Sequence, residues 1–137
     1  MKTDEKLYHY KAKIDRVVDG DTVDVLIDLG FDMHSRQRVR LWGINTPECR
    51  TRDKREKALG LAAKARLIEI LGFADNHCVI ATRLDRKGKF GRVLGILYVD
   101  DLDINEQLIE EGHAVEYYGG KKKKLSGPKI SPRFAKS

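Results

Sequence analysis

Alternating apolar and polar residues predict two β-strands near the amino terminus. The alternation covers residues 8–18 and again residues 21–29. One face of the second segment is aliphatic, with Val23, Val25, Ile27 and Leu29. Because a period of two places successive side chains on opposite faces of a strand, both segments fit half-buried strands. Asp19 and Gly20 between them are typical of a tight turn, so we expect a hairpin.

A third strand is expected over residues 36–42, where the alternation continues. Val39 and Leu41 fall on one face of this segment, whereas Arg40 falls on the other. Since the apolar face packs in the core, the Arg40 side chain is expected to point away from it.

Two segments carry the signals of helix starts and ends. Residues 53–56, Asp-Lys-Arg-Glu, match a capping box, and an apolar stripe follows until Gly72. This stripe comprises Leu59, Ala62, Ala63, Leu67 and Ile70. A second capping box at residues 103–106 opens a shorter helix that should end at Gly112.

Two further strands are expected over residues 77–84 and 90–99, on either side of the turn-forming residues 85–88. The predicted order is therefore three strands, a helix, two strands and a short helix. This order predicts a mainly β, α+β fold: a five-stranded β-barrel of the OB type with one helix after the third strand and a short C-terminal helix. Such barrels often bind nucleic acids, but a fold alone does not establish a function.

The positive charge of the chain is concentrated near its carboxyl end. The 137 residues carry a net charge of +6, but residues 119–137 contain seven Lys and Arg and no acidic residue, so residues 1–118 sum to −1. We therefore predict one folded domain over residues 1–118 and a flexible basic tail over residues 119–137. Such an arm can hold phosphate backbones through its charge, or simply keep the protein soluble.

The apolar segments and the cysteines indicate where in the cell the protein is expected to act. No apolar run is long enough to span a membrane and no signal-type segment opens the chain, so we expect a cytoplasmic protein without a membrane partner. We expect it to act as a monomer, and a phage or mobile-element origin stays open. Cys49 and Cys78 lack the spacing of a zinc site, so reduced thiols are expected, with a single disulfide as the alternative.

Three separated motifs resemble those of the staphylococcal nuclease (thermonuclease) family. They are Asp-Gly-Asp-Thr at residues 19–22, Arg40 followed by Asn-Thr-Pro-Glu at residues 45–48, and Phe-Gly-Arg at residues 90–92. The resemblance covers about residues 8–118 and keeps the order of the motifs. It implies an OB-fold barrel and calcium-dependent hydrolysis of phosphodiesters in DNA and RNA.

The candidate metal ligands are oxygen atoms of the first two motifs. Phosphodiester hydrolysis needs a cation on the phosphate, a base for water and donors for the developing charge. Asp21 offers a hard oxygen ligand for Ca²⁺ or Mg²⁺, although an aspartate beside a turn is also common for structural reasons.

The second metal motif departs from the family pattern. The backbone carbonyl of Thr46 remains available as a ligand, but Asn45 stands where the resemblance implies a second metal-binding aspartate. An amide brings no negative charge, so we predict Ca²⁺ binding weaker by about an order of magnitude or more. Asp19 is a further candidate through a bridging water.

The resemblance also implies the residues that do the chemistry. It assigns Glu48 as the general base, and Arg40 and Arg92 as the arginines that bind the phosphate. A guanidinium can donate two parallel hydrogen bonds to a phosphate, which an ammonium group cannot. From the residues alone, Glu48 could instead be a surface acid and Arg92 an exposed strand residue.

Three further residues are candidates for substrate contact. Tyr117 and Tyr118 follow the second predicted helix, near where the family places tyrosines that contact nucleotide, and aromatic rings stack on any base. Either tyrosine could instead belong to the core. Lys89 lies beside the third motif as a candidate phosphate contact, or as an ordinary exposed turn residue. Trp42 is expected to pack beneath the site.

Three interpretations of function stay open. The first is a metal-dependent phosphodiesterase or endonuclease that acts on DNA, RNA or both, with a preference for single strands because the basic tail stands where the family has a further helix. The second is a noncatalytic OB-fold module that binds nucleic acid through a degenerate metal site, which Asn45 favours. The third is a protein-interaction barrel whose tail docks on an acidic partner. Glu48, Arg40 and Arg92 favour the first, since a pure binder needs no base beside a cation site.

Overall fold

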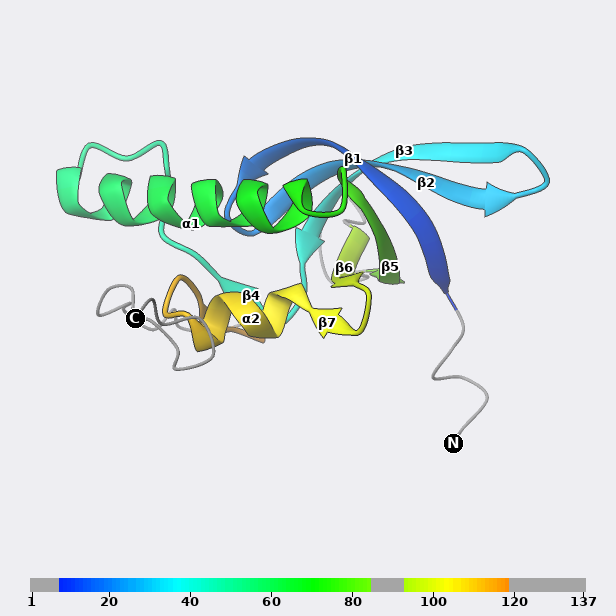
Figure 1. Ribbon diagram of the computed structural model, residues 1–137. Coiled ribbons are helices and arrows are strands. Elements are labelled where there is room, and N and C mark those ends of the chain that lie inside the picture. Colours follow the sequence, from blue (N-terminus) through cyan, green and yellow to red (C-terminus); the bar gives the residue numbers. More distant parts are fainter. Residues whose placement is uncertain (1–7, 85–92, 119–137) are drawn as a thin grey trace.

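The computed structural model describes residues 8–84 and 93–118 of the chain, and these residues form eight strands and two helices (Figure 1). The longer strands are β1 (His9–Asp19), β2 (Thr22–Gly30), β3 (Met33–Leu41), β5 (His77–Leu84) and β6 (Val93–Val99). The short strands are β4 (Ile44–Asn45), β7 (Leu102–Asp103) and β8 (Val115–Glu116). The helices are α1 (Lys54–Gly72) and α2 (Ile104–Glu110).

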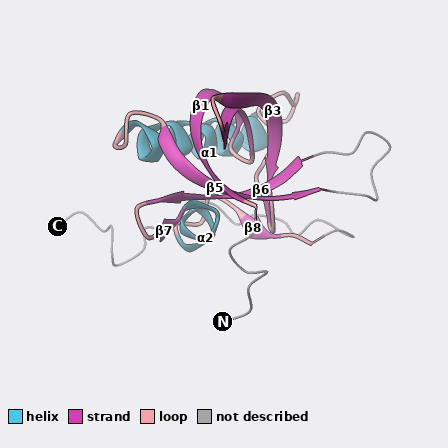
Figure 2. Ribbon diagram, turned by 90° about the vertical axis from the view of Figure 1, so that its right-hand side faces the viewer, coloured by secondary structure: helices cyan, strands magenta, loops and turns pink. Residues whose placement is uncertain are grey.

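The five longer strands close into a barrel. Antiparallel pairing gives the order β3-β2-β1-β5-β6, and β3 then pairs with β6 in parallel. Figure 2 shows the curved strands with α1 on one side and α2 on the other. This arrangement confirms the prediction of a mainly β, OB-type barrel with a helix after the third strand and a short helix near the carboxyl end.

The core consists of aliphatic side chains from the barrel strands and from both helices. Fully buried members include Val23, Val25, Val39, Leu41, Leu67, Leu71, Ile80, Leu97, Ile104 and Leu108. The predicted inward faces are confirmed, and Arg40 lies on the outer face of β3. Leu29 is the exception on β2, because it is 43% exposed where β2 leaves the barrel and continues into an arm.

The predicted helix starts are confirmed by their caps. Asp53 Oδ1 accepts hydrogen bonds from the backbone N–H groups of Arg55 and Glu56. The Asp53 N–H donates to Thr51 Oγ1, so a threonine completes the cap of α1 in place of the glutamate of a full capping box. Asp103 caps α2 through the N–H of Glu106.

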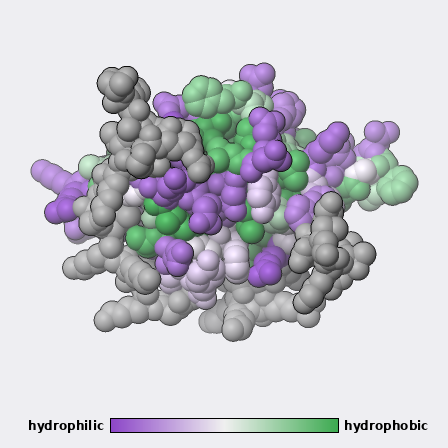
Figure 3. Space-filling model, turned by 60° about the horizontal axis from the view of Figure 1, so that its bottom comes forward, coloured by the Kyte–Doolittle hydropathy of each residue, from purple (hydrophilic) through white to green (hydrophobic). Residues whose placement is uncertain are grey.

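The third strand is longer than predicted. It begins at Met33 and pairs with β2 along its whole length, and Gly30, Phe31 and Asp32 turn the chain with positive φ angles. Residues 34–36 are all polar, so the sequence offered no alternation there. The tip of this β2–β3 arm carries exposed apolar side chains, with Phe31 97% exposed, and it projects at the right of Figure 3.

Other elements were missed or lie outside the described residues. Strands β4, β7 and β8 were not predicted, because strands of two residues are too short for a periodic pattern. The expected start of a strand at residues 90–92 and the expected tail lie outside the described residues. Cys49 and Cys78 are both buried, free thiols, so the disulfide alternative is wrong. In the described ranges, neither helix is long and apolar enough to cross a membrane.

Polar side chains tie α2 to the rest of the molecule. The Asn105 Nδ2 group donates to the carbonyls of Trp42 and Gly95, and Asn105 Oδ1 accepts from the Leu97 N–H. On the other side of α2, Arg66 of α1 donates two hydrogen bonds to the Glu111 carboxylate, at 2.6 and 3.0 Å. The helix is therefore held to both β6 and α1.

Candidate active site at the β1–β2 turn and the loop after β4

The carboxylate of Asp21 is fixed from two directions at the β1–β2 turn. Its Oδ2 atom accepts a 3.0 Å hydrogen bond from the Thr46 N–H, and its Oδ1 atom accepts one of 3.0 Å from Thr22 Oγ1. The turn lies tightly against α1, because a Cβ on Gly20 would be 2.8 Å from Ala63 Cβ. Only glycine fits this contact, so the turn places the buried Asp21 next to the loop after β4.

The Arg40 guanidinium lies among four oxygen atoms. Its Nη1 atom is 3.2 Å from Asp21 Oδ2, and its Nη2 atom is 3.2 Å from Asn45 Oδ1. Nη1 is also 3.4 and 3.3 Å from the backbone carbonyls of Asp21 and Leu41. The side chain is only 18% exposed, so both its position and its plane are restricted.

The loop that carries Asn45, Thr46 and Glu48 is supported from two sides. Asn45 is paired with Val115 of β8, which brings the carboxyl end of the described chain to this loop. On the other side, a Cβ on Gly60 of α1 would lie 2.7 Å from the backbone of Glu48. The glycine therefore lets α1 pack directly on the loop, and the path of the Glu48 backbone follows the position of the helix.

Glu48 itself is exposed, and its carboxylate makes no hydrogen bond or ion pair within residues 8–84 and 93–118. Thr46 is buried, and its Oγ1 atom has no hydrogen-bond partner among the described residues. The Asp19 carboxylate is close to the Cys49 thiol. Burial, together with this neighbouring carboxylate, raises the pKa of Cys49 to about 11, so Cys49 stays a neutral thiol.

The oxygen atoms around Asp21 fit a hard cation such as Ca²⁺ or Mg²⁺ by their chemistry. The Asp21 carboxylate and the Asn45 amide oxygen both contact Arg40, and Thr46, whose N–H donates to Asp21, carries a hydroxyl without a partner among the described residues. Asp21 contributes the one carboxylate of the set, and the described residues contain no group of three or more His, Cys, Asp or Glu able to hold a metal. Arg40 contacts both Asp21 Oδ2 and Asn45 Oδ1, so an ion at these atoms would share them with a positive charge.

An aromatic cluster adjoins the loop. The ring of Tyr118 meets the edge of the Trp42 ring with centroids 5.0 Å apart, and the Arg83 guanidinium carbon lies 4.6 Å from the Trp42 ring centroid. Tyr118 is 67% exposed, whereas Tyr117 is half-buried and its N–H donates to the Gly43 carbonyl. Of the two tyrosines, Tyr118 therefore presents more of its ring to solvent.

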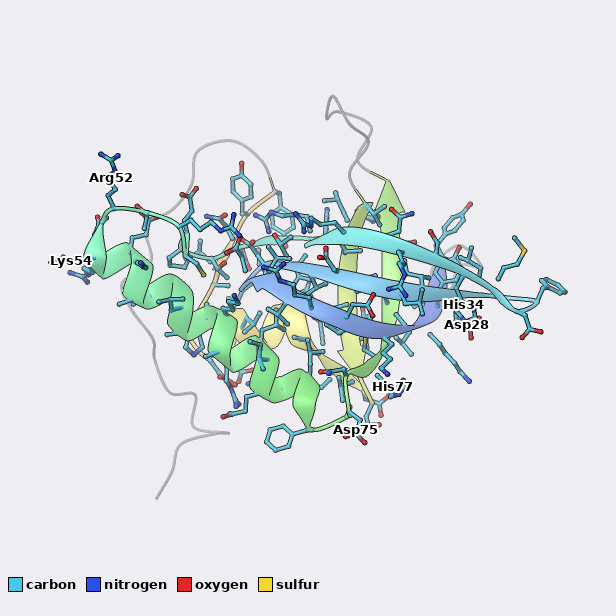
Figure 4. All side chains as sticks on the ribbon, turned by 90° about the horizontal axis from the view of Figure 1, so that it is seen from above. Asp28, His34, Arg52, Lys54, Asp75 and His77 are labelled. Carbon is cyan, nitrogen blue, oxygen red and sulfur yellow. The ribbon has the colours of Figure 1, made fainter. Side chains whose placement is uncertain are left out.

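Basic side chains dominate the segment after Glu48. The exposed basic residues are Arg50, Arg52, Lys54, Arg55 and Lys57, and Asp53 is an exposed acid among them. Figure 4 shows Arg52 and Lys54 at this end of α1, far from Asp28 and His34 on the β2–β3 arm. Five basic residues beside the loop favour a polyanionic ligand at this end of the molecule.

The structure thus brings four predicted residues into direct contact, namely Asp21, Arg40, Asn45 and Thr46. Glu48 lies on the same loop, and Tyr118 on the cluster next to it. Lys89 and Arg92 lie outside the described residues. Sequence reasoning missed Arg83, whose only signal is its outward position on a strand that the pairing places near Arg40.

The chain was compared with known proteins. A family model described as staphylococcal nuclease homologue matches residues 38–131. The SPbeta prophage-derived endonuclease YokF of Bacillus subtilis is 33% identical over 101 residues, which are 74% of this chain and 32% of that protein. Endonuclease YncB of the same organism is 30% identical over 74% of this chain and 45% of its own length. An uncharacterized protein of Methanocaldococcus jannaschii is 28% identical over 80% of this chain and 60% of its own length.

The matches cover only part of the length of the relatives. The chain spans about a third to a half of the two endonucleases that it matches. The family match runs past residue 118, so the boundary between a folded domain and a tail stays a prediction.

Proposed function

The chain belongs to the family of staphylococcal nuclease homologues, and from this premise we propose that it is a nuclease that hydrolyses phosphodiester bonds in DNA, RNA or both. The observation that carries this proposal is the Arg40 guanidinium, held among four oxygen atoms beside the loop of Glu48. Two relatives of the chain are named endonucleases, which supports the same reaction class.

In the proposed reaction, Glu48 accepts a proton from the attacking water. The water oxygen forms a bond to phosphorus, the bond from phosphorus to one sugar oxygen breaks, and that oxygen takes up a proton from solvent as it leaves. Glu48 is suited to the role of base because its carboxylate is exposed and makes no competing ion pair within the described residues. The contact between Gly60 and the loop backbone limits the positions that Glu48 can take.

Arg40 is proposed to bind the non-bridging oxygens of the phosphate, together with Arg92, as the charge on them grows. Because its side chain is already fixed by protein oxygens, little reorganisation is needed when the substrate arrives.

We further propose that Asp21, Asn45 and Thr46 hold a divalent cation, with Ca²⁺ as the expected ion. A bound cation would polarise the phosphate and offset its negative charge. With Asp21 as the one carboxylate of this set, the affinity should be low, since the number of charged ligands helps to set calcium affinity.

The substrate is proposed to be single-stranded and the protein a monomer. The exposed basic residues that follow Glu48 support a nucleic-acid partner, because they can follow a phosphate backbone away from the site. Lys89, Tyr117 and Tyr118 are proposed as further substrate contacts.

A noncatalytic nucleic-acid-binding module is the second candidate. It is favoured by the contacts of Arg40 with both Asp21 and Asn45, which would leave a phosphate-binding arginine in place and an ion poorly held. The same surface would then bind a strand without cutting it.

Release of acid-soluble nucleotide separates the two candidates. Single-stranded DNA and RNA are incubated with the protein over a series of Ca²⁺ concentrations and with EDTA. We expect release that rises with Ca²⁺, stops in EDTA and is lost in Glu48→Gln. The matched control is Glu106→Gln, which removes the charge of an exposed glutamate on α2 and should keep full activity. Strands that are bound but never cut by the wild type would establish the binding module instead.

A further inference from the structure

We propose that Trp42, Arg83 and Tyr118 form a subsite for the nucleotide next to the scissile phosphate. In this subsite the base stacks on the aromatic rings and the neighbouring phosphate binds Arg83. The inference rests on the proposed function, since it assumes that Arg40 receives the scissile phosphate. The ligand is a single strand of DNA or RNA, because only unpaired bases leave a free face for stacking.

The strand pairing places Arg83 in line with Arg40. Arg40 of β3 is the partner of Leu94 on β6, and Leu94 is the partner of Arg83 on β5. Directly paired residues point to the same face of a sheet, and here that is the outer face of the barrel. The two arginines are two strand spacings apart, or about 9.5 Å between backbones. A strand whose phosphate lies on Arg40 therefore passes Arg83 if it crosses these strands.

The aromatic rings lie beside this row. Trp42 comes two residues after Arg40, just beyond β3, and the residue is half-buried. Tyr118 can reach it because Gly43, at φ +80°, has no side chain: a Cβ there would be 3.1 Å from Tyr118 Cε1. The exposed Tyr118 ring and the Trp42 ring meet at an interplanar angle of 63°. Together they form an apolar corner next to two cations.

The charge of Arg83 indicates a site for an anionic ligand. Arg36, Arg38 and Arg40 on β3 are each paired with an aspartate. Arg83 is exposed, and within the described residues it has no carboxylate partner. Its contact with the indole orients the guanidinium, and its N–H donors meet no carboxylate from residues 8–84 and 93–118. A phosphate would supply the missing anion, with two parallel hydrogen bonds.

The sequence provides a direct reporter of this subsite, since Trp42 is the one tryptophan in the chain. The test titrates the full-length protein with single-stranded oligonucleotides in EDTA, so that binding is followed without cleavage. We expect Trp42 fluorescence to change with saturation, and to change much less when the oligonucleotide is abasic. An unchanged signal with a strand that binds by anisotropy would overturn the stacking part.

Variants test the phosphate part. Arg83→Ala should weaken binding of DNA and RNA alike, by about three- to tenfold at low salt, and reduce the slope of log affinity against log salt by about 0.7. Arg83→Lys should keep the slope. The matched control is Arg36→Ala, which removes the same charge from the far part of β3 and should leave affinity and slope as in the wild type. Equal effects of Arg83→Ala and Arg36→Ala would mean that only net charge matters, and would overturn the assignment of Arg83.

Failure of the subsite proposal can be distinguished from failure of the nuclease proposal. If wild type binds strands with the expected Trp42 signal but cleaves nothing with Ca²⁺, the subsite stands and the nuclease proposal fails. If it cleaves but Arg83 and Trp42 do not respond as expected, the nuclease proposal stands and the subsite fails. Trp42→Leu, which keeps an apolar side chain in place, should lower affinity about fivefold or more when measured by anisotropy with a labelled strand.

Discussion

Two arginines on the same face of β3 show how burial changes the role of an ion pair. Arg40, at the end of β3 near the site, pairs with Asp21, and the two side chains are 18% and 12% exposed. Arg38, two residues earlier, pairs with Asp24, but these side chains are 62% and 29% exposed. The exposed pair adds little to stability, because both charges are screened by solvent. In the half-buried pair, Arg40 also contacts Asn45 and two backbone carbonyls. These contacts fix the direction of the Arg40 guanidinium.

The strongest test of this difference is the loss of each arginine. Arg40→Ala should lower the rate of nucleotide release by about 100- to 1,000-fold, because it removes a fixed donor from the phosphate. Arg38→Ala should stay within about twofold of the wild type, since removing an exposed pair changes little. Initial rates at saturating Ca²⁺ measure both. Similar losses in the two variants would mean that burial does not distinguish the arginines.

The same comparison can be made for stability, with the pair between α1 and α2. Arg66→Ala leaves the buried Glu111 carboxylate without its guanidinium and should lower the free energy of unfolding by about 2–4 kcal/mol. Arg36→Ala breaks an exposed pair and should cost less than about 1 kcal/mol. Urea denaturation gives both values. The double variant Arg66→Met, Glu111→Leu should be more stable than Arg66→Ala, because no buried charge is left alone.

A second carboxylate next to Arg40 tests whether the number of charged ligands limits Ca²⁺ affinity. Asn45→Asp should tighten Ca²⁺ binding by about tenfold, or about 1.4 kcal/mol, because it adds a charged ligand beside Asp21. Calorimetry with Ca²⁺ measures the change. Asn76→Asp adds the same charge at an exposed position after α1 and should not affect the affinity. An Asn45→Asp protein that binds Ca²⁺ no better than the wild type would remove Asn45 from the proposed ligands.

Acid should weaken the contact between α1 and α2 in two steps. Burial lowers the pKa of His113 below 6.5, so the folded state favours neutral His113, and stability should fall as the pH drops from about that value. Burial alone would raise the pKa of Glu111, but hydrogen bonds from Arg66 and Gln107 outweigh it, so the pKa lies below 4.5. Its contribution should be lost as the pH falls below that point. Urea denaturation over this pH range tests both steps, and His113→Gln should remove the first.

The smallest effect is expected at the tip of the β2–β3 arm. Phe31 is 97% exposed there and contributes little packing, so Phe31→Ser should change the free energy of unfolding by less than about 0.5 kcal/mol. The rate of nucleotide release should not change either. A clear loss of activity would show that the arm takes part in substrate binding and that the site end of β3 does not act alone.

The sequence predicted the parts of the molecule that rest on local patterns. Alternation placed Arg40 outside the core, and Asp53 and Asp103 marked the helix starts. The pairing of β4 with β8 was missed, because two-residue strands carry no period, and their alignment depends on the closed barrel. For the same reason, the sequence could not place Arg83 in the row of Arg40, since that row crosses strands far apart in the chain.

The candidate site was predicted as a set of residues but not as a set of contacts. The motifs named Asp21, Arg40, Asn45 and Thr46, and the structure brings these four together. The contact of Arg40 with both candidate metal ligands depends on the side-chain rotamers of three separate segments, which no periodicity encodes. Lys89 and Arg92 stay predictions, because they lie outside the described residues.

The contact between Gly60 and the loop of Glu48 has a consequence for motion. A glycine inside a helix weakens it by about 0.5–1 kcal/mol relative to alanine, yet here it lets the α1 backbone touch that of Pro47 and Glu48. Neither segment can then open without disturbing the other, and they should exchange their amide protons as one cooperative unit. The loop that carries the proposed base would thus owe its rigidity to the close approach of the α1 backbone at Gly60.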